Sequence, residues 1–167
     1  MMALRPEDGT TAGAPADPDP ASTRVLIVDD HDMFAESLLL ALDVAGFRVQ
    51  RAPSLALEVV LATGADADVV LLDLQFDSDG TTSLPLVDPL RAAGATVVMV
   101  TGVDEPARLG ECLEAGACSV VNKSEPLETL IHATREAAAG RSVNPGATRT
   151  ALLQALRLQR AEFGLRT

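Results

Sequence analysis

The chain has 167 residues, a formal net charge of −11, and hydrophobic residues at 47% of its positions. This length suits one domain with additional tails, and the hydrophobic content is sufficient for a buried core. Because the chain is strongly acidic, we do not expect it to bind nucleic acid or an anionic membrane through its own charge. It contains no run of about 18 apolar residues, so no membrane-spanning segment is expected either.

The N-terminal 23 residues differ in composition from the rest of the chain. They are rich in Ala, Pro, Asp, Gly and Thr, and the run from Asp17 to Pro20 cannot continue a helix or a central strand. We predict that residues 1–23 form a disordered acidic tail without catalytic residues. The N-terminal region also lacks the basic and apolar segments of a signal peptide. Elsewhere in the chain, the only two cysteines, Cys112 and Cys118, lack the spacing of metal ligands. We therefore expect a cytoplasmic protein with reduced thiols.

From residue 24 onward, short apolar runs alternate with amphipathic segments. The apolar runs predict five strands, at residues 24–28, 47–52, 68–73, 96–101 and 119–123. The amphipathic segments predict five helices, at about residues 32–45, 54–63, 83–93, 105–115 and 126–139. Successive strand–helix repeats predict an α/β fold, a doubly wound parallel sheet with right-handed crossovers and helices on both faces.

The C-terminal segment has a different pattern. Residues 140–147 contain Gly, Pro and polar residues and predict a linker, and a last helix is predicted at about 148–160. Apolar residues gather on one side of this helix at Leu152, Leu153, Ala155 and Leu156. Two interpretations remain open: a short helix that docks on the domain, or a signalling linker that contributes to a dimer contact.

Chemically reactive residues stand where predicted strands end. They are Asp29 and Asp30 after the first strand, Asp73 at the third, Thr101 at the fourth and Lys123 at the fifth. Ligands of an open parallel sheet bind at the carboxyl ends of its strands, so we expect these side chains to converge in one pocket. A single strand-end Asp or Lys is often only a solvated terminus, and Asp32 is expected simply to cap the first helix.

Three neighbouring carboxylates repel one another and require a compensating cation. Mg²⁺ suits this role because it binds one or two protein carboxylates and leaves positions for phosphate oxygens. An Asp can accept a phosphoryl group as an acyl phosphate, and a Lys or Thr can bind the phosphoryl oxygens. The set of residues therefore predicts phosphoryl chemistry with Mg²⁺ as the cofactor.

The same residues lie in motifs that together resemble the receiver domain of bacterial two-component response regulators. The matching segments are Val25–His31, Val70–Leu74, Val98–Gly102, Glu114–Ala117 and Val121–Lys123. The resemblance covers roughly residues 24–140, and the motif after the first strand is most similar to the NarL/LuxR-like subgroup, whose members carry a C-terminal helix-turn-helix domain. It implies a flavodoxin-like (βα)5 fold with strand order 2-1-3-4-5.

The resemblance also implies a role for each site residue. Asp73 would be the phosphoacceptor, and Mg²⁺ would be held by Asp29, Asp30, Asp73 and the backbone carbonyl of Gln75. Thr101 and Lys123 would bind the phosphoryl group. The chain would thus be a regulatory phosphoacceptor rather than an enzyme, and it would receive the phosphoryl group from a histidine kinase.

The implied organisation is a tail at 1–23, a receiver domain at 24–140, and a linker with a C-terminal helix at 141–167. We expect the receiver to change conformation on phosphorylation and to control an output, transcription. A homodimer would form through the fourth helix, fifth strand and fifth helix. DNA would be bound only by a helix-turn-helix domain outside this chain.

Several positions depart from the family pattern. Val120 stands where the family often has a switch Tyr or Phe, and Ser124 stands where Pro often follows the lysine. Asp77 and Asp79 add negative charge close to the phosphoacceptor. These departures leave a receiver-like interaction module that signals without phosphorylation as the alternative.

Two other functions fit the residues less well. A flavin-binding electron carrier needs a Ser-, Thr- or Gly-rich phosphate loop after the first strand, but residues 29–32 are acidic. An Mg²⁺-dependent phosphatase needs a second acid two residues after Asp73, where Gln75 stands. Neither histidine is assigned to the site: His31 is expected on the surface beside the pocket, and His132 in the fifth helix.

Overall fold

The structure is a computed structural model that describes residues 17–76 and 80–165. Residues 1–16 of the predicted tail therefore lie outside the described residues. So do Asp77 and Asp79, the two acidic positions that follow the predicted phosphoacceptor. Residues 17–23, which we assigned to the tail, include a short 3-10 helix, η1 (Pro20–Ser22). The carbonyl of Thr23 accepts a hydrogen bond from the backbone N–H of Arg48.

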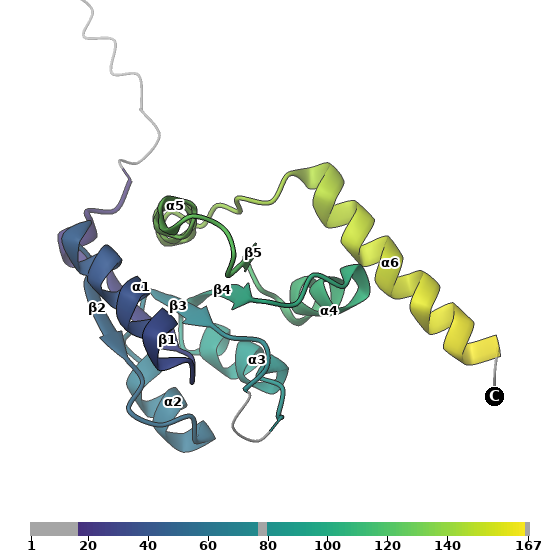
Figure 1. Ribbon diagram of the computed structural model, residues 1–167, viewed down its shortest axis with the longest axis horizontal. Coiled ribbons are helices and arrows are strands. Elements are labelled where there is room, and N and C mark those ends of the chain that lie inside the picture. Colours follow the sequence, from purple (N-terminus) through teal and green to yellow (C-terminus); the bar gives the residue numbers. More distant parts are fainter. Residues whose placement is uncertain (1–16, 77–79, 166–167) are drawn as a thin grey trace, which may run out of the picture.

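Five parallel strands form one sheet in the order β2-β1-β3-β4-β5, which confirms the predicted fold (Figure 1). The strands are β1 (Arg24–Val28), β2 (Arg48–Arg51), β3 (Val69–Leu72), β4 (Thr96–Thr101) and β5 (Ser119–Asn122). All four residues of β3 are buried, as are the last four of β1. Such continuous apolar burial is typical of a strand that is covered on both faces.

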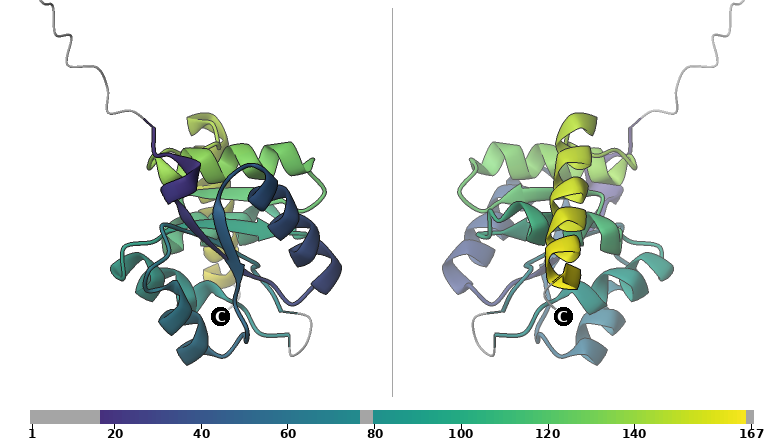
Figure 2. Two further views of the ribbon diagram at one scale, coloured as in Figure 1. Left: turned by 90° about the vertical axis from the view of Figure 1, so that its left-hand side faces the viewer. Right: turned by 90° about the vertical axis from the view of Figure 1, so that its right-hand side faces the viewer.

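The helices are α1 (Asp32–Val44), α2 (Leu57–Gly64), α3 (Leu84–Ala92), α4 (Pro106–Ala115), α5 (Leu127–Ala138) and α6 (Gly146–Leu165). Helices α1 and α5 cover one face of the sheet, and α2, α3 and α4 cover the other (Figures 1 and 2). Neighbouring strand residues point to opposite faces, so Leu26 and Val28 join one core cluster while Val25 and Ile27 join the other.

Two helix starts differ from the prediction. Helix α2 begins at Leu57 rather than at residue 54, because the hydroxyl of Ser54 accepts a hydrogen bond from the N–H of Ala56 in a local turn (3.1 Å). The prediction that Asp32 caps α1 is wrong. His31 occupies the cap position without a side-chain cap bond, and the Asp32 carboxylate instead lies 2.7 Å from the guanidinium of Arg51.

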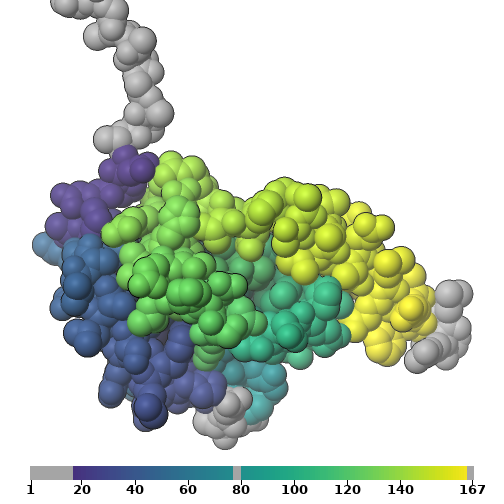
Figure 3. Space-filling model, turned by 45° about the horizontal axis from the view of Figure 1, so that its top comes forward, coloured from purple at the N-terminus to yellow at the C-terminus, as the bar shows by residue number. Residues whose placement is uncertain are grey.

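Helix α6 is longer than the predicted 148–160, since it runs from Gly146 to Leu165 directly after Pro145. It packs across α4, and its C-terminal part extends beyond the domain (Figures 1 and 3). Leu156, which lies on the predicted apolar side, is buried in this contact. The helix therefore docks on the domain, as the first of our two interpretations stated.

The expectations about membrane-spanning segments and about the cysteines can be compared with the described residues. None of the helices in that part of the chain is long and apolar enough to cross a membrane. Cys112 and Cys118 are both free thiols. Burial raises the pKa of the Cys112 thiol to about 12, so that this side chain behaves as a core residue.

Candidate functional site

The polar residues at the strand ends do meet at the carboxyl edge of the sheet. Asp29 and Asp30 follow β1, Asp73 follows β3, Thr101 ends β4, and Lys123 follows the last residue of β5. A cavity of about 460 Å³ at this edge is lined by, among others, His31, Phe34, Asp73, Gln75, Thr101 and Lys123. The parallel topology alone brings these side chains together, because every β-strand of the sheet ends at the same edge.

The centre of the pocket is a compact group of charges. Carboxylate oxygens of Asp29, Asp30 and Asp73 and a ring nitrogen of His31 all lie within 4.8 Å of one another. The ammonium of Lys123 lies 2.6 Å from Oδ2 of Asp29 and 3.1 Å from Oδ2 of Asp73. Three neighbouring carboxylates repel one another, so the group has the oxygen donor set that attracts a divalent cation.

The carboxyl of Asp73 is strongly affected by its surroundings in this group. Its side chain is 4% exposed, and burial raises its pKa above the ordinary value. The neighbouring charge of Asp29 raises this pKa further, while Lys123 and a backbone hydrogen bond from Gln75 lower it only in part. The charged form of Asp73 is therefore disfavoured until a cation or another positive group joins it.

Thr101 is buried beside this group with its hydroxyl already engaged. Its Oγ1 accepts a hydrogen bond from the backbone N–H of Val103 (3.0 Å). Gln75 lines the same cavity and pairs with Thr82 in an isolated antiparallel bridge, which fixes the backbone after Asp73. Val120 lies apart from the pocket, buried in the core cluster between the sheet and α4.

Residues 25–135 match the response regulator receiver domain. The chain belongs to this family. The match covers more than half of the chain and includes every residue that the acidic pocket brings together.

Two kinds of curated protein contain a region similar to this receiver domain. It is 28% identical over 138 residues to "Probable transcriptional regulatory protein NarL" of Mycobacterium tuberculosis, a match that covers 77% of this chain and 60% of that protein. It is 32% identical over 108 residues to a cyclic di-GMP phosphodiesterase of Thermotoga maritima, covering 64% of this chain and 28% of the relative. The match thus spans less than two thirds of the length of the first relative and less than a third of the second.

Solved structures also resemble this receiver domain. The signal receiver domain of NarL from Mycobacterium tuberculosis matches with a TM-score of 0.62 and 29% identity, over 73% of this chain and all of that chain. A LuxR family DNA-binding response regulator from Silicibacter pomeroyi matches with a TM-score of 0.58 and 30% identity, over 75% of this chain and 98% of that one. These matches confirm the resemblance to NarL/LuxR-like receivers.

The receiver pocket contains a residue that we had placed only beside it. Nδ1 of His31 lies 3.0 Å from Oδ1 of Asp29, 3.0 Å from the Lys123 ammonium and 3.5 Å from Oδ2 of Asp73. The sequence feature that could have revealed this contact is the position of His31 directly after the two acids. At the end of a strand, a chain that turns into a helix keeps three successive residues at the same edge, and the His31 N–H donates to Asp29 (2.8 Å).

Two further residues support the pocket without having been predicted. The buried hydroxyl of Ser83 donates a hydrogen bond to the backbone carbonyl of Asp73 (2.5 Å) and so joins the end of β3 to the start of α3. The ring of Phe34 lies under the Lys123 ammonium, 4.9 Å from ring centre to nitrogen. Ser83 and Phe34 are ordinary residues of helical segments in the sequence, so only the tertiary structure reveals these contacts.

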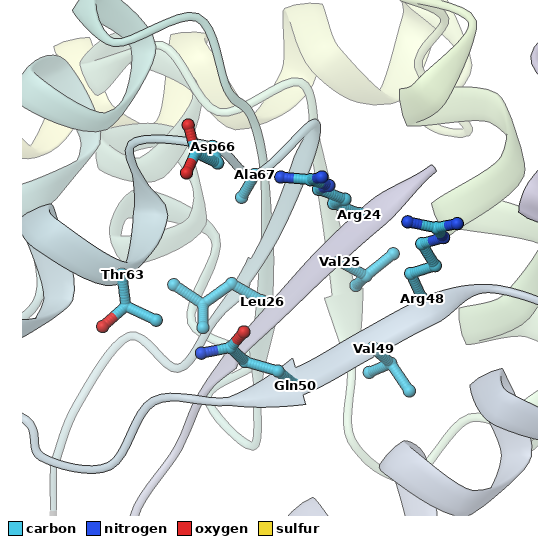
Figure 4. Close-up of a pocket in the computed structure, with 9 residues that line it drawn as sticks. All are labelled: Arg24, Val25, Leu26, Arg48, Val49, Gln50, Thr63, Asp66 and Ala67. Atoms are coloured by element: carbon cyan, nitrogen blue, oxygen red, sulfur yellow. The ribbon is translucent and has the colours of Figure 1, made fainter. Parts of the chain in front are cut away.

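A second cavity lies far from this chemistry. Figure 4 shows the residues that line it, at the amino ends of β1 and β2 of the receiver. The volume of this cavity is about 300 Å³. Its charged lining residues are Arg24, Arg48 and Asp66, and the rest of its lining is Val25, Leu26, Val49, Gln50, Thr63 and Ala67. None of the residues that form the acidic pocket contributes to it, so we assign the function to the carboxyl edge.

Proposed function

We propose that this receiver domain accepts a phosphoryl group on Asp73 from the phosphohistidine of a histidine kinase. The observation that supports the proposal is the position of the Asp73 carboxylate, buried beside Asp29, within 3.1 Å of the Lys123 ammonium, and at the wall of an open cavity. In the transfer, an Asp73 oxygen forms a bond to phosphorus as the bond from phosphorus to the kinase imidazole breaks. The imidazole then takes up a proton and leaves as a neutral or protonated side chain.

The donor set fits Mg²⁺. Three carboxylates and a backbone carbonyl are hard oxygen ligands, and oxygens of all three carboxylates lie within 4.8 Å of one another. Asp29, Asp30, Asp73 and the carbonyl of Gln75 would hold the ion. The bound ion would neutralise charge on the phosphoryl oxygens during transfer.

Lys123 and Thr101 would bind the phosphoryl group after transfer. The Lys123 ammonium already lies between Asp29 and Asp73, so a small movement brings it to a phosphoryl oxygen. The Thr101 hydroxyl can donate a hydrogen bond to another oxygen if its side chain turns toward Asp73. Both contacts are made only in the phosphorylated state and would therefore favour a different conformation.

Membership of the receiver family supports a proposal about the wider role. We propose that phosphorylation regulates transcription through a DNA-binding domain outside the present sequence, in a cytoplasmic protein. A homodimer through α4, β5 and α5 is part of this proposal, but α6 covers α4 in the described structure. Such a dimer would require α6 to move.

Incubation with acetyl phosphate tests the proposed chemistry directly. We expect the intact mass to rise by one phosphoryl group when Mg²⁺ is present and not when EDTA is added. The product should be an acyl phosphate that hydroxylamine cleaves. Incorporation that is insensitive to EDTA, or resistant to hydroxylamine, would contradict the proposed chemistry at Asp73. Absence of any mass gain would favour a module that signals without phosphorylation.

A further inference from the structure

Helix α6 approaches α4 closely enough that their backbones almost touch. A side chain added at Gly110 of α4 would place its Cβ 2.4 Å from the carbonyl oxygen of Leu152 and 3.1 Å from Cβ of Leu156. Leu156 itself is 2% exposed. No residue larger than glycine fits at position 110 while α6 is docked, so this contact depends closely on the position of α4.

Polar contacts at the rim fix the direction of α6. Both terminal nitrogens of the Arg160 guanidinium reach the two oxygens of Glu114, at 2.8 and 2.7 Å. The amide of Gln159 lies 3.4 Å from the carboxylate of Glu105, the residue that precedes α4. Exposed pairs of this kind add little free energy, but the bidentate geometry orients the two helices.

The segment before α6 closes the open edge of β5. The side chain of Asn144 accepts a hydrogen bond from the N–H of Val120 (2.8 Å) and donates one to its carbonyl (3.0 Å). An amide carries one acceptor and one donor group, so it satisfies an edge strand as a neighbouring strand would. Arg149, at the start of α6 itself, adds a hydrogen bond to the carbonyl of Cys118 (2.9 Å). The segment is thus attached at the same strand position where the family often has an aromatic switch.

A short path joins this contact to the phosphorylation pocket. The Thr101 hydroxyl accepts the N–H of Val103, and Val103 packs on the core cluster that also receives Leu152 of α6. Turning this hydroxyl toward a phosphoryl group on Asp73 would change its bond to Val103. The loop from Gly102 to Glu105 leads directly into α4, so a change there displaces the helix on which α6 rests.

We propose that the surface formed by α4 and β5 is an internal binding site whose ligand is the chain's own segment 141–165. This segment is docked in the unphosphorylated protein and loosens when Asp73 is phosphorylated, so it serves as the output element of a receiver that lacks an aromatic at Val120. The inference rests on the proposed phosphorylation of Asp73. It adds that the tight fit at Gly110 converts a shift of α4 into release of α6.

Hydrogen exchange of the whole chain with Mg²⁺ and beryllofluoride, a phosphoryl mimic, tests this inference. Fluorine NMR reports whether the mimic binds, independently of α6. We expect exchange of the α6 amides to quicken at least about fivefold on binding, the lower end of typical coupling between sites. Binding without any change in α6 exchange overturns the inference and leaves the proposed function standing. Absence of binding overturns both.

The coupling must also work in reverse, because linkage is reciprocal. Gly110→Ala should displace α6 and tighten beryllofluoride binding at least about fivefold, by the same coupling. Gly164→Ala is the matched control, since a Cβ there meets nothing within 4 Å. Asn144→Ala releases the segment at β5 instead, and it provides the same test if Gly110→Ala does not fold. Unchanged affinity in a variant whose α6 exchanges faster contradicts the inference.

Discussion

The acidic pocket and the α4–α6 contact are held in opposite ways. In the pocket, burial and the charge of Asp29 raise the pKa of the Asp73 carboxyl, so its arrangement costs free energy until a cation is bound. At the α4–α6 contact, Leu156 is buried and Arg160 is paired with Glu114, so this arrangement is satisfied as it stands. We therefore expect a bound cation to stabilise the pocket, whereas the α4–α6 contact is satisfied without a ligand.

The largest expected loss of stability is at the α4–α6 contact. Leu156→Ala removes a buried side chain and should weaken α6 docking by about 2–5 kcal/mol, the usual cost of such a truncation. Leu158→Ala is the control, because Leu158 is 60% exposed and its loss should cost less than about 0.5 kcal/mol. Hydrogen exchange along α6 measures both. Equal effects of the two variants would show that α6 is not held through Leu156.

The next effect concerns the pocket. Mg²⁺ at about 100 times its dissociation constant should stabilise the fold by roughly 2.7 kcal/mol, because it relieves the crowded carboxylates. Asp30→Ala should remove this gain, whereas Asp66→Ala, at the opposite edge of the sheet, should keep it. Calorimetric melting with and without Mg²⁺ provides the comparison. A full Mg²⁺ response in Asp30→Ala would contradict the assigned ligands.

A smaller gain is expected from Asp73→Asn in buffer without Mg²⁺. The folded-state pKa of Asp73 is raised, so between its ordinary value of 3.8 and the raised value the folded protein binds more protons than the unfolded chain. Its free energy of unfolding therefore falls as pH rises through that range. Asparagine does not carry this charge, so the variant should melt higher than wild type at neutral pH and not below pH 3.8. A lower melting temperature at neutral pH would show that the Lys123 contact outweighs the burial of the charge.

The smallest effect is expected at the rim of α6. Arg160→Ala removes an exposed ion pair with Glu114, so the melting temperature should hardly change. Exchange in the last turns of α6 should become faster, and added salt should mimic the variant in wild type. A loss of stability similar to that of Leu156→Ala would show that charge pairing, rather than burial, holds the helix.

The sequence predicted the pocket well because topology determines it. Once five strands are parallel, the residues after them must share one edge, so Asp29, Asp73 and Lys123 meet without any knowledge of packing. His31 was missed because a residue beside the acids could equally have pointed to solvent. The roles of these residues remain predictions, whereas the fold and the family are confirmed.

The contact of α6 could not be predicted in the same way. The apolar side of the helix indicates that something covers it, but not which element. That choice depends on the glycine at position 110, which leaves room for α6 to pack closely. It also depends on the length of the segment between α5 and α6, which places Asn144 beside Val120. Both are three-dimensional fits between segments more than 20 residues apart in the chain, and no periodicity records them.

The most direct test of the account is the site of phosphorylation. Wild type, Asp73→Asn and Asp66→Asn are each incubated with a small-molecule phosphodonor and Mg²⁺, and their intact masses are compared. The account predicts one phosphoryl group on wild type and on Asp66→Asn, located on the peptide that carries Asp73, and none on Asp73→Asn. An undiminished mass gain in Asp73→Asn would contradict it.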